Sequence, residues 1–485
     1  MKGYPGIRGI AYKEDLLWER SRKGRVGISI PEADVPSADL DPSLVGAEPK
    51  LPELSEVDVV RHYTRLSTWN FGLDTGMYPL GSCTMKYNPK INESLCALPG
   101  FANVHPMLPD AYMQGVLKLM YEFEQDLLKL TGMKAATLEP SAGAQGELTG
   151  MLMIYAYHAK QGKQRHKIIM PSTAHGTNPA SAALCGYKPV PVELSPDGVV
   201  TPDDIRAIMD EDTAGIMLTN PNTLGIFESH VAEVADIIHK KGGLVYGDGA
   251  NMNAMMGYVD VAKMGVDVMH INVHKTLSTP HGGGGPGAGP VVVNEALEPF
   301  LPVPRVRKKG DRYTLDYDAP LSVGRLQSFL GNFAVLVKAF AYTRTMGADL
   351  KAATEAAVLN ANYVKAKLKD DFHLPFPQAS LHEVIFNDAK QHDAGVTTMD
   401  IAKRLLDCGF HAPTVYFPLV VDGAIMIEPT DTESKDELDA FISAMKDIAA
   451  DAKSDPAKIT SAPQNTIVSR PDETRAAREL ILKGE

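Results

Sequence analysis

Residues 214–248 read AGIMLTNPNTLGIFESHVAEVADIIHKKGGLVYGD, and their pattern decides the class of fold. The runs AGIMLTN and GLVYGD are short and apolar, as buried strands are. Between the runs, apolar residues recur at helical spacing and two glycines follow; these residues are Val231, Val234, Ile237 and Ile238. A strand, a helix and a strand in succession predict a right-handed crossover between two parallel strands.

Similar apolar runs lie on both sides of this unit. The predicted strands are KAATLE from Lys134, KIIMP from Lys167, AGIMLTN from Ala214, GLVYGD from Gly243, VDVMHINV from Val266 and GPVVVN from Gly289. Because short buried strands alternate with helical stretches, we predict an α/β fold whose mostly parallel central sheet is sandwiched by helices. Ligands of such sheets bind at the carboxyl ends of the strands.

Composition and periodicity divide the chain into parts. The predicted parts are an extended N-terminal arm at 1–100, a large α/β domain at 101–333, a small C-terminal α+β domain at 334–450 and a polar tail at 451–485. The arm is rich in Pro, Gly and polar residues, and such an arm often crosses a dimer interface. In the small domain we expect a long helical stretch from about Phe333 to about Leu368 and strands in LHEVIFND and AIMIEPT.

Charge and cysteine content argue against several classes of protein. The 485 residues carry 48 basic and 60 acidic side chains, a net charge of −12, which disfavours a protein that mainly clamps nucleic acid. No CxxC pair occurs, so neither a disulfide framework nor a zinc site is predicted for Cys83, Cys96, Cys185 and Cys408. No apolar run approaches the roughly 18 residues of a membrane span. We therefore expect a cytoplasmic protein that binds neither nucleic acid, membrane nor metal.

Two predicted strand ends carry side chains suited to covalent chemistry. Lys275 follows a strand in NVHKTLSTPHGGGGPGAG, residues 272–289, where a lone lysine is usually just the first solvated residue. Asp248 ends the run GLVYGD. This carboxylate is either a turn former or a buried group that needs a cationic partner, such as a protonated pyridine nitrogen.

Two further strand ends offer an anion cradle and a stacking ring. In EPSAGAQGELTGM, residues 139–151, small residues let the backbone approach an anion, and the following helix offers free N–H groups. A plain tight turn is the alternative reading. The spacing matches neither GxxxxGK[ST] nor GxGxxG, which disfavours nucleotide binding. His175, in PSTAHGTNPAS, is either structural or able to stack on an aromatic cofactor ring.

Together the four features supply an amine, a carboxylate, an anion cradle and a flat ring face, which is the set that pyridoxal 5′-phosphate requires. The amine of Lys275 would bond to the cofactor aldehyde, and an amino-acid substrate would displace it. Asp248 would keep the pyridine nitrogen protonated, so that the ring draws electrons from the substrate α-carbon. Loss of this carboxylate is therefore expected to damage chemistry more than folding.

The chain resembles a known family, the decarboxylating glycine dehydrogenases or P-proteins of the glycine cleavage system, in the second subunit of their split form. The resemblance covers nearly the whole chain and rests on WERSRKGRVGISIPEADVP, MYPLGSCTMKYNP at 77–89, EPSAGAQGEL, AHGTNPASA, LTNPNTLGIFE, GDGANMNA, NVHKTLSTPHGGGGPG, FHAPTVYFP and MIEPTDTES. GSCTMKYNP and HKTLSTPHGGGGPG are specific to this family, whereas the lysine and aspartate pattern occurs throughout the aspartate-aminotransferase-like fold, fold type I.

The resemblance implies a role for each candidate residue. Lys275 is similar to the lysine that anchors the cofactor, and Asp248 to the partner of its pyridine nitrogen. The other implied cofactor contacts are His175 and Ala250 on the two ring faces, Gly143, Ala144 and Gln145 around the phosphate, and His274 nearby.

The resemblance also implies a reaction and its partners. In this family glycine loses CO2, and its aminomethyl group passes to the lipoyl-lysine arm of the H-protein. The partner chain, subunit 1, lacks the cofactor lysine, so an α2β2 assembly is expected. Chain length supports the split form, because a fused enzyme would carry a second, similar domain ahead of this one.

Two other functions stay open at this point. The first is another enzyme of the same fold, such as a cysteine desulfurase or an aminotransferase, and the second is a non-catalytic subunit of the complex. Cys83 would suit a desulfurase, but the family gives it no nucleophile role, so it is left out of the predicted catalytic set. The tract Gly282 to Gly285 is either a hinge or a place where backbone passes close to the phosphate and the lipoyl arm.

Overall fold

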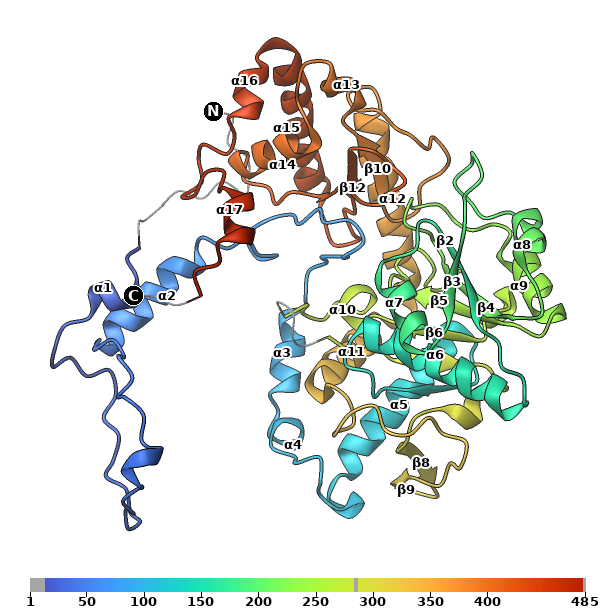
Figure 1. Cartoon of the computed structure of the whole chain (residues 1–485), viewed down its shortest axis with the longest axis horizontal. Coiled ribbons are helices and arrows are strands. Elements are labelled where there is room, and N and C mark those ends of the chain that lie inside the picture. Colours follow the sequence, from blue (N-terminus) through green and yellow to red (C-terminus); the bar gives the residue numbers. More distant parts are fainter. Residues whose placement is uncertain (1–13, 283–286, 483–485) are drawn as a thin grey trace.

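The computed structural model describes residues 14–282 and 287–482, so Gly283 to Gly285 of the glycine tract lie outside the described residues. A seven-stranded sheet forms the centre of the larger unit (Figure 1). Its strands are β1 Ala135–Thr137, β2 Lys167–Pro171, β3 Lys188–Val192, β4 Thr213–Thr219, β5 Leu244–Gly249, β6 Val268–Ile271 and β7 Val291–Val293. Their order is β1-β7-β6-β5-β4-β2-β3, and only the pairs made by β7 are antiparallel. The predicted mostly parallel sheet is confirmed.

One strand of the central sheet was not predicted from the apolar runs. Strand β3 lies at the edge of the sheet and reads KPVPV. Proline cannot donate a hydrogen bond to a ladder, so within sheets it is confined mainly to edges. The two prolines of β3 therefore fit its edge position. They also interrupt the apolar run, so the sequence pattern did not indicate a strand here.

Helices cover both faces of the sheet. Along β5, Val245 belongs to the core that includes residues of α5 and α9, whereas Tyr246 belongs to the core with α6 and α7. The helices around the sheet are α5 Gln114–Thr131, α6 Gly143–Lys160, α7 Thr177–Leu184, α8 Pro202–Ile208 and α9 Val231–Lys240. Helix α5 ends at Gly132, whose φ of 74° is the left-handed conformation that glycine adopts readily at a helix end.

A smaller unit is built on an antiparallel sheet of three strands in the order β10-β12-β11. Its elements are α12 Leu350–Leu368, β10 Val384–Asn387, α13 Ala389–His392, α14 Thr398–Asp407, β11 Thr414–Val415, β12 Ala424–Ile427, α15 Lys435–Ser454 and α16 Pro456–Thr460. Phe386, Ile425 and Phe441 lie in its core. Ile459 is buried in the same core, so the packing of this unit continues past residue 450.

The helical stretch predicted from Phe333 to about Leu368 consists of two long helices. Helix α11 Phe333–Met346 packs on the larger unit through Val335 and Leu336, and α12 begins the smaller unit. Gly347 lies between them with a φ of 49°, a conformation that helical residues do not adopt. The break redirects the chain from one unit to the other, within the helical stretch that the sequence predicts.

The remaining elements are short. They are α1 Leu17–Arg20, η1 Pro42–Leu44, α2 Glu56–Ser67, α3 Lys90–Cys96, α4 Pro99–Ala102, η2 Asp110–Tyr112, η3 Ala262–Met264, α10 Val273–Thr276, η4 Glu298–Phe300, β8 Arg305–Lys309, β9 Arg312–Asp316, η5 Gly347–Asp349 and α17 Glu473–Arg478. Strands β8 and β9 form a separate antiparallel hairpin. No helix in the described part of the chain could cross a membrane.

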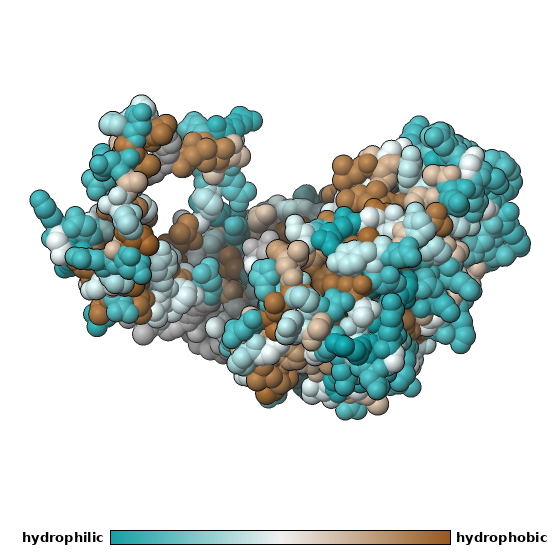
Figure 2. Space-filling view, turned by 90° about the horizontal axis from the view of Figure 1, so that it is seen from below, coloured by the Kyte–Doolittle hydropathy of each residue, from teal (hydrophilic) through white to brown (hydrophobic). Residues whose placement is uncertain are grey.

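The arm that contains α1 and α2 projects away from both units (Figure 1). Its side chains Ile28, Ile30 and Leu44 are 74%, 82% and 77% exposed. Figure 2 shows apolar side chains along this projecting loop, which stands apart from the body at the left. Apolar side chains gathered on one exposed segment are typical of an interaction surface.

Candidate active site

Three polar side chains meet at the carboxyl ends of neighbouring strands. Asp248 of β5 is paired in register with Thr219 of β4 on one side and with His270 of β6 on the other. The hydroxyl of Thr219 donates to the Asp248 carboxylate at 3.3 Å, and Nε2 of His270 lies 3.5 Å from its Oδ1. The register of the parallel sheet therefore builds the centre of the site.

Asp248 is 4% exposed, yet it stays charged. Burial alone would raise its pKa, but His270 and the hydrogen bonds from the Ala250 backbone and the Asn178 side chain outweigh burial, and the pKa lies below its ordinary value. The Ala250 N–H donates at 3.0 Å and Nδ2 of Asn178 at 3.1 Å. These donors are neutral, so the carboxylate keeps its negative charge for a cationic ligand.

Lys275 lies on the short helix α10, immediately after β6, and is half-buried. It lines a cavity of about 280 Å³ together with Asp248. The strand β6 ends at Ile271, and the turn at Asn272 aims the next residues across the carboxyl edge of the sheet. An amine and a buried carboxylate thus share one cavity, as the sequence predicts.

The N-terminus of α6 forms one wall of this cavity. Gly143 and Ala144 line it. A Cβ atom on Gly143 would lie 2.3 Å from Oδ1 of Asn272, and one on Gly289 would lie 2.3 Å from the Ala142 carbonyl, so neither place tolerates a side chain. Exposed N–H groups at the start of an 18-residue helix, approached without side chains, are suited to bind a phosphate.

Gln145 differs from its neighbours on α6. Its side-chain oxygen accepts hydrogen bonds from the backbone N–H and the hydroxyl of Ser141, at 2.7 and 2.9 Å. The Gln145 side chain is therefore occupied in closing the turn before α6. Its side chain does not reach the cavity, and only its backbone N–H remains at the helix start as a possible phosphate contact.

His175, Ala250 and His274 also line the cavity. The His175 ring is exposed on one side, and its Nδ1 lies 3.0 Å from the Thr177 hydroxyl. Burial lowers the pKa of His274 to about 3, so this ring is neutral, and its Nδ1 has no hydrogen-bond partner among the described residues. An unpaired, buried ring nitrogen at the cavity wall is suited to meet a ligand.

The sequence did not indicate several carboxylates around the cavity. Glu147, one turn into α6, has its pKa raised to about 8 by burial and by the charge of Asp248, and it accepts a hydrogen bond from Thr177. Glu147 lies in a helical stretch where a glutamate is common, so nothing in the local sequence indicates that its carboxyl is buried. Only the approach of α6 to β5 makes this carboxyl hold its proton.

Three further side chains lie just before β10 and just after β12, and the two before β10 line the cavity. They are His382, Glu383 and Glu428, all buried and close enough to share one ion. Burial and the charge of Glu428 raise the pKa of Glu383 to about 8. Glu428 accepts hydrogen bonds from the backbone and hydroxyl of Thr84 at 3.0 and 2.6 Å, and the raised pKa of Glu383 keeps a proton on that carboxyl.

Comparisons with known proteins agree with this geometry. The family described as glycine dehydrogenase, C-terminal domain, matches residues 353–472, and the aminotransferase class-V family matches residues 145–302. A protein named probable glycine dehydrogenase (decarboxylating) subunit 2, from Alkaliphilus oremlandii, is 52% identical over 477 residues, 97% of this chain and 98% of the relative. This chain belongs to the glycine dehydrogenase (decarboxylating) subunit 2 family. The same-named protein of Listeria innocua is 53% identical over 475 residues, 96% of this chain and 97% of that protein.

Solved structures show that this chain has the fold that its sequence predicts. A crystal structure of glycine decarboxylase (P-protein) of the glycine cleavage system, in inhibitor-bound form, superposes with a TM-score of 0.71 at 20% identity, covering 84% of this chain and 93% of that chain. A cysteine desulfurase from Escherichia coli reaches 0.60 at 18% identity, covering 78% and 95%. The fold is the aminotransferase-like fold type I, and at these identities the likeness extends to the fold alone.

Proposed function

We propose that this chain binds pyridoxal 5′-phosphate, decarboxylates glycine and transfers the aminomethyl group to the lipoyl-lysine arm of the H-protein. The observation that supports this proposal best is one cavity that holds the Lys275 amine, the charged Asp248 carboxylate and the start of α6. The shared family of the 52%-identical relative supports the choice of glycine over other amino acids.

The described residues fit this cofactor. Gly143 has no room for a side chain beside Asn272, and with Ala144 it brings the start of α6 to the cavity wall, as a phosphate site needs. Oδ1 of Asn272 and Nδ1 of His274 are buried without hydrogen-bond partners among the described residues, and both belong to residues that line the cavity. Unpaired buried polar atoms cost free energy, which a bound ligand would recover.

When bound, the cofactor supplies an electron sink at the substrate α-carbon. The chain's own residues do the rest. Lys275 would hold the cofactor through its amine and move a proton at Nζ, and the charge of Asp248 would favour a protonated ring nitrogen. The protonated carboxyl of Glu383, lying in the same cavity, adds no negative charge to repel the glycine carboxylate.

Cysteine desulfurase is the second candidate, since enzymes of that activity share the fold. Such an enzyme needs a reactive thiolate. Burial raises the pKa of Cys83, the cysteine near Lys275, so the thiol stays protonated. This argues against the desulfurase reaction, and the charged Asp248 and the amine of Lys275 argue against a non-catalytic subunit.

Subunit 1, the H-protein and glycine are the proposed partners, in an α2β2 assembly. The word "subunit" in the relatives' name supports a partner chain, and the exposed apolar side chains of the arm offer it a surface. The four cysteines are free thiols, which fits the reducing cytoplasm that we propose as its location.

Reconstitution tests the function. The full chain is combined with subunit 1, lipoylated H-protein, pyridoxal 5′-phosphate and glycine labelled at its carboxyl carbon. We expect labelled CO2 that requires both proteins. Bound cofactor without CO2 release from glycine would refute the substrate assignment.

Covalent mapping tests the site separately. The loaded protein is reduced with borohydride, digested and analysed by mass spectrometry. The modified residue should be Lys275. The nearby buried Lys86 serves as an internal comparison, because a label there would contradict the assignment.

A further inference from the structure

The segment MYPLGSCTMKYNP, residues 77–89, crosses from the smaller unit to the larger one beside the cavity. Leu80 forms a β-bridge with Ile427 of β12, and Thr84 bonds to Glu428. At its centre lies Lys86, whose side chain is 1% exposed. The chemistry proposed above gives this lysine no task, although burying an ammonium group is costly unless it is fully paired.

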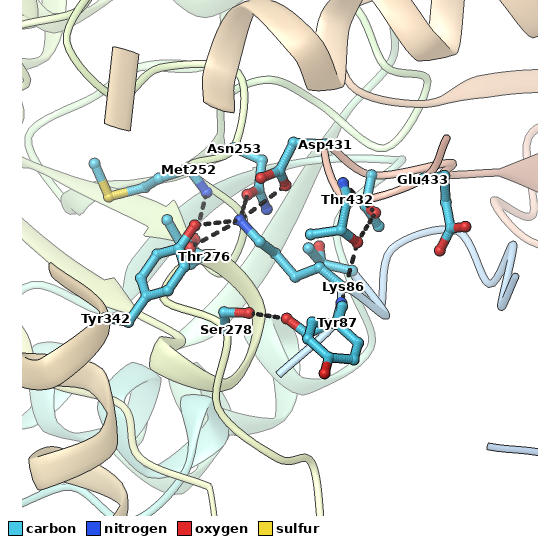
Figure 3. Close-up of polar contacts among 12 residues, drawn as sticks. Lys86, Tyr87, Met252, Asn253, Thr276, Ser278, Tyr342, Asp431, Thr432 and Glu433 are labelled. Atoms are coloured by element: carbon cyan, nitrogen blue, oxygen red, sulfur yellow. Dashed lines mark hydrogen bonds and ion pairs between the residues drawn. The ribbon is translucent and has the colours of Figure 1, made fainter. Parts of the chain in front are cut away.

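Lys86 is fully paired, as Figure 3 shows. Its Nζ forms an ion pair with Asp431 at 2.8 Å and donates to the hydroxyl of Tyr342 at 3.1 Å, to Oδ1 of Asn253 at 3.2 Å and to the carbonyl of Thr276 at 3.4 Å. Burial alone would lower the pKa of Lys86, but Asp431 and Tyr342 keep the pKa above its ordinary value. The ammonium is therefore a permanent charge inside the protein.

The four acceptors come from four different parts of the structure. Tyr342 belongs to α11, and Asp431 to the loop after β12 in the smaller unit. Asn253 lies in the loop that follows Asp248 on β5, and Thr276 is the last residue of α10. One ammonium group thus holds both segments of the larger unit that carry the proposed chemistry.

The contact with Thr276 completes a helix end. The carbonyls in the last turn of a helix have no partner within the helix, and a cation there is favourable. Helix α10 has only four residues and cannot be stable by itself. Its end is held from the same segment a second time, because the Ser278 hydroxyl donates to the Tyr87 carbonyl.

We propose that Lys86 is a positioning residue for Lys275: by capping α10 at Thr276 and pairing with Asp431, it fixes the reactive amine relative to Asp248. The role of Lys275 as cofactor anchor rests on the proposed function, whereas the capping of α10 does not. Lys86 itself does not line the cavity.

Substitutions separate positioning from plain stabilisation. Lys86→Met alone leaves the Asp431 carboxylate buried and unpaired, so it is expected to unfold at a lower temperature. The double variant K86M/D431N removes both charges and should regain most of the stability, but it cannot cap Thr276. Lys90→Met is the matched control, since Lys90 lies on the same part of the chain and its ion pair with Asp74 is exposed.

Two measurements on the full chain in complex with subunit 1 decide the matter. The first is the hydrogen-exchange rate of the backbone amides in the peptide that covers residues 273–278, measured without cofactor. The second is the rate at which added pyridoxal 5′-phosphate bonds to Lys275. In K86M/D431N we expect exchange about 10-fold faster and bonding about 10- to 100-fold slower, with K90M unchanged.

Each other outcome contradicts the proposal. If K86M/D431N returns to wild-type stability, hydrogen-exchange rate and rate of bonding to the cofactor, Lys86 only stabilises the fold through its ion pair with Asp431. If exchange rises but bonding is unaffected, Lys86 does not position the amine. If the cofactor never bonds to Lys275 in the unmodified protein, the proposed function fails, and the exchange measurement still tests the cap on α10.

Discussion

Oδ1 of Asp248 lies 3.5 Å from Nε2 of His270 on the neighbouring strand. On the other side of the imidazole, the hydroxyl of Tyr246 lies 2.6 Å from Nδ1. Burial raises the pKa of Tyr246 well above its ordinary value and lowers that of His270, so the phenol donates and the ring stays neutral with its proton on Nε2. Asp248 is therefore flanked by a neutral ring that does not hydrogen-bond to it, and its charge remains available to a ligand.

Asp248→Asn tests this charge. The amide has the same shape and retains an acceptor for the Ala250 N–H, so the free energy of unfolding should change by no more than about 1–2 kcal/mol. Glycine decarboxylation should fall by about 10²- to 10³-fold, because the electron sink loses its electrostatic support. Asp267→Asn is the control, since Asp267 is also buried and pairs with His239 at 2.8 Å, outside the cavity. Equal losses of activity in both variants would contradict the assignment.

Gly143→Ala tests the phosphate cradle. The new methyl group would lie 2.3 Å from the Asn272 side chain, so either α6 or Asn272 must move. We expect cofactor affinity to fall by about 10-fold or more, measured by fluorescence titration. Gly115→Ala, on α5, meets no atom within 4 Å and should leave the affinity unchanged. Tight binding in the Gly143→Ala variant would place the phosphate elsewhere.

Glu383 predicts a pH dependence of stability. The folded protein raises its pKa from 4.5 to about 8, so between these values the folded state holds a proton that the unfolded state has lost. Stability contributed by this group is therefore present at low pH and lost as the pH rises through that window. Glu383→Gln should weaken the fall of the unfolding temperature between pH 5 and about 8.

Glu147 adds to the same slope through its own raised pKa of about 8, so the dependence is reduced in Glu383→Gln but not abolished. Glu193→Gln, at an exposed position, provides the comparison. Parallel stability curves for wild type and Glu383→Gln across the window would show that Glu383 does not hold its proton.

The arm predicts a separation of folding from assembly. Replacing Ile28, Ile30 and Leu44 by serine removes exposed apolar surface without touching either core, so the unfolding temperature should stay the same. Association with subunit 1, measured by light scattering after gel filtration, should weaken by at least about 10-fold. Leu359→Ser, 68% exposed on α12, is the control. Unaltered association would exclude the arm as the interface.

Much of the site was predictable from strand ends. Asp248 and Lys275 lie at the ends of apolar runs that form parallel strands. Because the carboxyl ends of parallel strands meet at one edge of the sheet, the two residues are expected to lie close together. The start of α6 was recognisable for the same reason, through its small residues. The break at Gly347 was missed because apolar spacing continues across it, and a single glycine does not reveal a change of direction.

The sequence by itself determined the parallel sheet, the family and the pair Lys275 and Asp248, because apolar periodicity and motifs are local properties. The tertiary structure alone decided which charges are buried and which carboxyls hold protons. Thr84 and Glu428, which bond to each other, are 344 residues apart, and Lys86 reaches Asn253 across 167. The pKa of a carboxyl and the contribution of an ion pair to stability depend on desolvation by residues far away in the sequence. A local sequence pattern therefore cannot predict either quantity.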